Sequence, residues 1–293
     1  MRFQLVVQAL SFSLLNFDEI SELQAASMSA GHRMCWGGVL VLGGALVATA
    51  QQPPAVSELA NPGRPSVSSP ATPTPVGYVQ FQTGYLGAAD SPDLSSQSSV
   101  NEVLNFSVTP RVELMVGAQP YAHSHVEGQS TNEAGGVSLG IQGVIYHGQA
   151  AKPTIAVSYF HQIYGGNAPD LDIGSSTNDL LILASADVKG FHYDANNFFN
   201  EVVKDPVRRA QFGQSLSISH LLGKNFSVTG EIWHFSQPFL QSNTVGTLWA
   251  LSYNAWKNLV LDGGFNRGLT STSTQWEVFV GFTYLLPYKI RLR

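Results

Sequence analysis

From Val76 to the end of the chain, apolar and polar residues alternate with a period of two, in segments that recur about every twenty residues. Near the C-terminus, for example, Trp276, Val278 and Val280 share one face and Glu277 lies on the other. This alternation is typical of strands whose two faces meet different surroundings. A helical period of 3.6 is not sustained anywhere in this region. The pattern therefore predicts an all-β domain over residues 76–293.

Twelve candidate strands can be counted. They lie near 76–88, 98–109, 111–123, 135–147, 153–164, 177–187, 190–199, 210–221, 225–237, 245–254, 258–267 and 274–285. Tight connections alternate with longer polar loops, which fall at 124–134, 164–176 and 200–209. An even strand number, with short turns at one end and long loops at the other, is the layout of an outer-membrane barrel. We expect a closed antiparallel transmembrane β-barrel of about 12 strands, with both termini at the end that carries the short turns.

The face opposite the apolar one carries charged and amide side chains, which are costly to bury in a dry core. In an outer-membrane barrel the apolar face contacts lipid and the polar face lines the lumen. The predicted lumen-lining residues are Gln82, Asn105, Arg111, Glu113, Gln142, Asp194, Asn196, Glu231, Asp262, Asn266 and Glu277. Carboxylates outnumber the single arginine in this set, so the lumen is expected to be weakly acidic and to favour cations or neutral solutes over anions.

Composition and net charge exclude several other classes of protein. Charged residues make up 12% of the chain and hydrophobic residues 44%, which is too apolar for a disordered chain. No apolar run reaches the roughly 18 residues of a transmembrane helix. The formal net charge of −5 disfavours a surface for nucleic acid. The one cysteine, Cys35, excludes an internal disulfide and zinc sites built on several cysteines.

The N-terminal part of the sequence is interpreted as a targeting segment followed by a linker. His32 and Arg33 precede an apolar run that ends in small residues at Ala48 and Ala50. These are the parts of a secretory signal peptide at 28–50, so residues 1–27 are interpreted as lying upstream of the true start. Residues 51–75 hold seven prolines among Ser, Thr and Ala, which predicts a disordered linker. Together with the barrel pattern, the signal peptide predicts the outer membrane of a Gram-negative bacterium.

Short motifs at 80–85, 109–114, 137–140, 194–196 and 261–269 carry a family resemblance. The chain resembles the bacterial outer-membrane transporter family of the phenol meta-cleavage degradation pathway, over about 76–285. It departs from that pattern at Gln82, where an acidic residue is usual, and at Gln142, where a basic residue is usual. The resemblance implies a small outer-membrane β-barrel that passes hydrophobic or aromatic compounds.

Few residue groups suggest chemistry. His123, His125 and Glu127 are metal-ligand types, but they lie in an expected loop, which rarely preorganises a site. Ser219 with His220, and Ser158 with His161, supply the residue types of a hydrolytic dyad without a spacing that brings them together. His192 and Asp194 share a strand face and are interpreted as part of a polar lumen wall.

The sequence therefore predicts a porin-like channel or transporter for small solutes, with no catalytic residues, no cofactor and no metal. Its expected partners are outer-membrane lipid, the barrel-assembly machinery during biogenesis and the solute, but not nucleic acid. The alternative is a non-transporting outer-membrane barrel, either a structural protein or a lipid-modifying hydrolase.

Overall fold

The computed structural model describes residues 59–290, except 93, 150, 170, 172–175, 205 and 241. The predicted signal peptide, the segment before it and residues 51–58 lie outside the described residues. Among the residues that are described, no helix has the length and apolar composition needed to cross a membrane.

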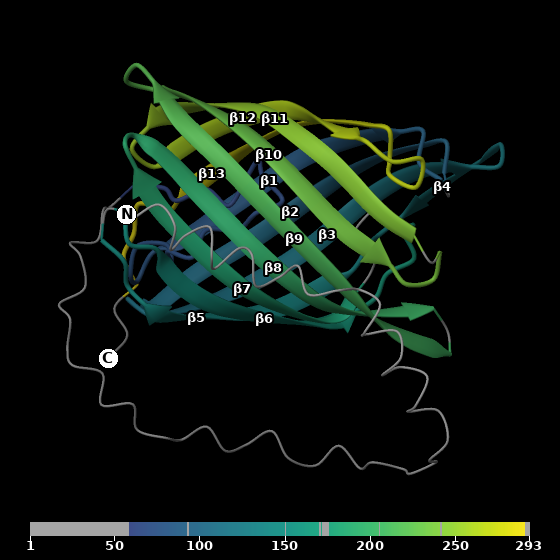
Figure 1. Cartoon of the computed structure of the whole chain (residues 1–293), viewed down its shortest axis with the longest axis horizontal. Coiled ribbons are helices and arrows are strands. Elements are labelled where there is room, and N and C mark those ends of the chain that lie inside the picture. Colours follow the sequence, from purple (N-terminus) through teal and green to yellow (C-terminus); the bar gives the residue numbers. More distant parts are fainter. Residues whose placement is uncertain are drawn as a thin grey trace, which may run out of the picture. The chain divides into compact units, whose positions relative to one another are not determined.

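Thirteen strands are present in the described part of the chain, all antiparallel to their neighbours in one sheet. They are β1 (Val79–Ala89), β2 (Ser96–Thr109), β3 (Val112–Val126), β4 (Gln129–Glu133), β5 (Val137–Tyr146), β6 (Thr154–Tyr164), β7 (Ser176–Val188), β8 (Phe191–Lys204), β9 (Val207–Leu222), β10 (Phe226–Gln237), β11 (Ser242–Trp256), β12 (Leu259–Gly268) and β13 (Trp276–Leu285). Of the described strands, β4 pairs with β3 alone, so twelve strands form the wall. Because β1 pairs with both β2 and β13, the wall is closed (Figure 1). The predicted closed barrel of about 12 strands is confirmed.

The short turns lie at the end of the barrel where β1 begins and β13 ends. Between β7 and β8, Lys189 and Gly190 have φ angles of 52° and 83°, the left-handed values that a two-residue type I′ hairpin turn requires. The opposite end carries the longest connection, the β6–β7 loop between Tyr164 and Ser176, together with shorter ones. There the carbonyl oxygen of Pro169, in the β6–β7 loop, accepts a hydrogen bond of 2.8 Å from the interior side chain of Gln97.

The prediction of a loop over residues 200–209 is wrong. Strands β8 and β9 remain paired to Lys204 and Val207, and only two residues connect them. The expected loop at 124–134 also contains a hairpin, formed by the end of β3 and by β4. The sequence does not reveal these extensions, because strand ends that contact water on both faces are polar throughout. They therefore lack the alternation of apolar and polar residues.

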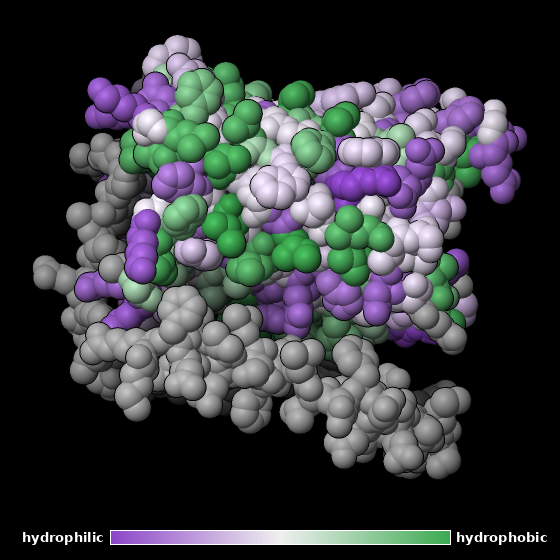
Figure 2. Space-filling model, turned by 45° about the horizontal axis from the view of Figure 1, so that its top comes forward, coloured by the Kyte–Doolittle hydropathy of each residue, from purple (hydrophilic) through white to green (hydrophobic). Residues whose placement is uncertain are grey.

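The outward face of the wall is apolar. Its exposed large side chains include Leu104, Leu114, Val116, Leu139, Ile141, Leu180, Ile182, Leu216, Ile218, Ile232, Leu251, Leu261, Val278 and Val280. Figure 2 shows patches of hydrophobic side chains over the wall, with hydrophilic ones between them and toward both ends. So much exposed apolar surface is unfavourable in water and is typical of a wall that contacts hydrocarbon.

The interior also contains an aromatic cluster that the alternation did not single out. Phe235 of β10 lies between Phe198 and Trp233, with ring centroids 5.1 and 6.0 Å away. Trp233 and Phe235 each lie over a glycine of a paired strand, Gly246 and Gly213 respectively. A glycine on a strand leaves room for such a ring.

We expect Gly246→Ala to lower the free energy of unfolding by about 1–3 kcal/mol. The new Cβ would lie 2.2 Å from Cζ2 of Trp233, so the indole must shift within a packed interior. Gly143→Ala is the matched control, because a Cβ there meets nothing within 4 Å. Urea unfolding in detergent, followed by tryptophan fluorescence, measures both variants. Equal stabilities would contradict the packing described.

Candidate functional site

Residues 61–77, here called the ring, follow the inside of the wall and contact strands in their order around the barrel. The path starts at β1, passes β12, β10, β9, β8, β7, β5 and β3, and ends at β2. Nδ2 of Asn61 donates to the carbonyl oxygen of Thr72 at 2.7 Å, which ties the two limbs of the ring together. The chain then enters β1 at Val79. The ring therefore lies inside the barrel.

The ring corrects the prediction of a disordered linker. Residues 59–75 are described, and side chains of the wall bind their backbone. Proline has no backbone N–H to satisfy and favours extended conformations, which suits a path along a wall. Hydrogen bonds to the wall, rather than a core of its own, offset the entropy lost when this segment is ordered.

Glu231 of β10 is buried and binds the middle of the ring. Its Oε2 accepts the backbone N–H of Val67 at 2.8 Å, and its Oε1 accepts both the N–H and the hydroxyl of Ser68, at 2.7 and 2.6 Å. The Ser68 hydroxyl is also 2.8 Å from Oγ of Ser215 on β9. Both carboxylate oxygens are acceptors, as in an ionised group, and such charge-assisted bonds are stronger than neutral ones.

Glu113 of β3 binds the ring a second time, close to β1. Its Oε1 accepts the N–H of Thr74 at 2.9 Å and also the Thr74 hydroxyl. Oγ of Ser107 donates to the same oxygen at 3.1 Å, and Nδ2 of Asn105 donates to Oε2 at 3.3 Å. The carboxylate thus joins the ring to the walls of β2 and β3.

Amide side chains of the wall bind the ring backbone between these carboxylates. The pairs are Gln80 with Asn61, Gln82 with Gly63, Asn196 with Ser69, and Gln142 with the carbonyl oxygens of Pro70 and Ala71. An amide offers both a donor and an acceptor. It can therefore satisfy an extended backbone that has no strand partner.

Asp262 of β12 faces the guanidinium of Arg64 in the ring. Its Oδ1 is 3.3 Å from Nη2 of Arg64, and its side chain is 1% exposed. The other oxygen, Oδ2, and the Nε of Arg64 are both buried without a hydrogen-bond partner. The ion pair is therefore one long contact rather than the two parallel bonds that a guanidinium and a carboxylate can make.

The structure buries most of the predicted lumen-lining side chains in the interior. The buried ones are Gln82, Asn105, Glu113, Gln142, Asp194, Asn196, Glu231, Asp262 and Asn266. Glu277 is partly buried and accepts a bond of 2.8 Å from Asn266. Asp194 accepts a bond from Ser185 and lies 3.2 Å from Nε2 of His192. Most of this set contacts the ring directly or through one neighbour.

Arg111 is the exception, because it is only partly buried. It lies in the β2–β3 turn, where the backbone leaves the extended conformation and strand alternation no longer decides the direction of a side chain. Its guanidinium donates to the carbonyl oxygens of Val144 and Ile145 at 3.1 and 3.2 Å. Arg111 therefore binds backbone carbonyl oxygens near the turn, whereas the ring's Arg64 pairs with the interior carboxylate of Asp262.

The prediction from the sequence included neither the interior aromatic residues nor the ring. Counting by twos from Glu231 places Trp233 and Phe235 on the same face, so the signal was present. Trp233 donates from Nε1 to Oδ1 of Asn266 at 2.9 Å, within the polar network. No comparable signal marks the ring, because its partners are spread over the whole barrel.

The candidate hydrolytic pairs are not assembled in the described structure. Ser158 is buried and donates to Gln142, whereas His161 contacts Asn178 on the other side of the wall. Ser219 and His220 are neighbours on β9 and so point to opposite faces. This geometry gives no support to the hydrolase alternative.

The histidines at the loop end contact strand β4. Nδ1 of His123 lies 2.8 Å from Oδ1 of Asn132, and Nδ1 of His125 lies 3.0 Å from Oγ of Ser130. Within the described ranges, no group of three His, Cys, Asp or Glu side chains is arranged to bind a metal ion.

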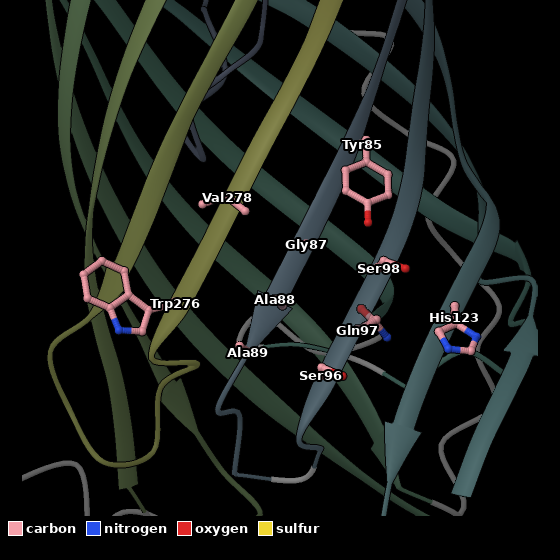
Figure 3. A pocket seen from close by; sticks show the side chains of 10 residues that line it. All are labelled: Tyr85, Gly87, Ala88, Ala89, Ser96, Gln97, Ser98, His123, Trp276 and Val278. Carbon is pink, nitrogen blue, oxygen red and sulfur yellow. The ribbon is translucent and has the colours of Figure 1, made fainter.

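A pocket on the outer wall lies apart from the ring. Small residues of β1 and β2 line it between Tyr85 and Trp276, as Figure 3 shows. Tyr85, Trp276 and Val278 are exposed on the outward face. None of its lining residues belongs to the ring or to the carboxylates that bind it.

An apolar outer wall, a closed sheet of twelve strands and a polar interior define the class of outer-membrane β-barrels. The COG4313 outer membrane channel from Pseudomonas putida F1 has a similar fold, with 13% identity, a TM-score of 0.55, and coverage of 77% of this chain and 99% of that one. The NanC porin is similar at 8% identity and a TM-score of 0.51, covering 71% of this chain and 100% of that one. At these identities the likeness shows the fold. No protein-family model and no curated protein sequence matches the chain.

Proposed function

We propose that the protein is a channel for small solutes in a bacterial outer membrane, and that the ring closes the channel in the state described. The observation that carries this proposal is the set of wall carboxylates, Glu231, Glu113 and Asp262, that bind a segment of the same chain inside the barrel. A purely structural barrel can fill its interior with side chains alone. A separate, hydrogen-bonded segment can leave without unfolding the wall.

The interior surface supports a proposal for the class of solute. Trp233, Phe235 and Phe198 form an apolar surface that packs against Ala71 and Val67 of the ring. Once the ring leaves, this surface fits the hydrophobic or aromatic compounds that the sequence resemblance implies. The carboxylates lower the energy of cations there and raise that of anions. Outer-membrane lipid is the proposed partner of the wall, and the barrel-assembly machinery is the proposed partner during biogenesis.

Two measurements test this proposal. The protein extracted from outer membranes is expected to give small, infrequent openings in planar bilayers, since the ring occupies the lumen. Liposome swelling is expected to be faster with small cationic or neutral aromatics than with matched anions. A complete lack of conductance, both in the wild type and in a variant without the Glu231 carboxylate, would contradict the proposed function.

A further inference from the structure

Arg64 of the ring lies in a recess between β1 and β13. Gly84 and Gly281 are paired across these two strands. A Cβ on Gly84 would lie 2.2 Å from Nη2 of Arg64, and one on Gly281 would lie 2.8 Å from the same atom. Glycine at position 84 therefore leaves a space that the guanidinium group fills. Glycine at position 281 leaves room both for this group and for the backbone oxygen of Thr83, which would lie 2.5 Å from a Cβ there.

Asp262 supplies the negative charge beside this recess, but only one of its two carboxylate oxygens has a partner. Arg64 satisfies one of its oxygens with a bond of 3.3 Å, and the buried Oδ2 has no partner. A buried polar atom without a hydrogen bond is unfavourable, and more so when it is charged. The ring backbone fixes the position of Arg64, whereas a free guanidinium can turn to pair with both oxygens.

We propose that Asp262, Gly84 and Gly281 form a binding site for a small solute that carries a guanidinium or primary ammonium group, and that this solute displaces Arg64 from the wall. The inference rests on the proposed function, because it names the solute class that opens the channel. The interior carboxylates of Glu231 and Glu113 favour the same sign of charge.

A solute that binds in place of Arg64 reduces the population of the closed state by mass action. The ring keeps its bonds to Glu231 and Glu113 when Arg64 leaves, so solute binding lowers the stability of the closed state without abolishing it. A solute that binds the displaced state better than the closed one shifts the population toward it. Neutral solutes of the same shape lack the charge and compete poorly for Asp262.

The test measures binding of agmatine, which carries a guanidinium and an ammonium group, by calorimetry on the full-length protein in detergent. Arg64→Ala removes the internal competitor and is expected to raise the affinity for agmatine about tenfold, the difference made by one charge-assisted hydrogen bond. Adding Asp262→Asn to Arg64→Ala is expected to remove this gain. The neutral probe N-butylurea is expected to bind both variants equally weakly.

If the variant with Asp262→Asn does not fold, a second pair of variants tests the same site. In the Arg64→Ala background, Gly84→Ala fills the recess and is expected to weaken agmatine binding. Gly87→Ala on the same strand is its control, since a Cβ there has its nearest neighbour at 3.6 Å. Equal agmatine affinities in the Gly84→Ala and Gly87→Ala variants would overturn the proposed site.

Conductance separates this inference from the proposed function. A wild-type protein that conducts, together with an Arg64→Ala variant that prefers agmatine no more than N-butylurea, overturns the site and leaves the channel. Agmatine binding that depends on Asp262, in a protein that never conducts, supports the site and overturns the channel.

Discussion

Glu231→Gln is expected to raise the fraction of time that the channel conducts by roughly 30-fold to 1000-fold, up to saturation. Glutamine keeps the size of the side chain but turns one acceptor oxygen into a donor, which faces an N–H of Val67 or Ser68. The loss of a charge-assisted bond and the burial of an unpaired donor together cost the closed state about 2–4 kcal/mol. Each 1.4 kcal/mol or so changes an equilibrium tenfold. Single-channel recording in planar bilayers measures the open fraction.

Glu201→Gln is the matched control for this variant. Glu201 also accepts hydrogen bonds on both oxygens, from the side chains of Asn178 and Arg208, but it lies on the β8 extension at the loop end, away from the ring. Its replacement is expected to leave the open fraction unchanged. The account would be contradicted if both variants opened equally, or if Glu231→Gln behaved as the wild type does.

The wall was predictable because alternation is local information. Each strand places alternate residues on opposite faces, so Glu231 and Asp262 could be assigned to the interior from their neighbours alone. The same rule places Trp233 inside when it is counted from Glu231, but the polar pattern alone did not single it out. Arg111 could not be assigned to a face in this way, because the rule ends where the strand becomes a turn.

The ring was not predictable because its order depends on long-range partners. Val67 and its acceptor Glu231 are 164 residues apart in the sequence. Composition reports only that a Pro-rich segment has little apolar surface to bury. It cannot report that the rest of the chain forms a closed wall whose inner face presents carboxylates and amides to that segment.

A disulfide between the ring and the wall is expected to abolish the openings. Oγ of Ser68 and Oγ of Ser215 are 2.8 Å apart, so cysteines at these positions lie within reach of a bond of about 2.05 Å. The sequence's one cysteine, Cys35, is replaced by serine to avoid mispairing. The control is Ser227→Cys with Ser252→Cys, which face each other on β10 and β11 and link wall to wall.

Conductance of the Ser68→Cys/Ser215→Cys protein before and after reduction tests the central claim, that the ring must leave the wall for solute to pass. We expect no openings in the oxidised protein, full recovery after a reducing agent, and no redox effect in the wall-to-wall control. Oxidised protein that conducts as well as reduced protein, with the disulfide verified by mass spectrometry, would contradict the claim.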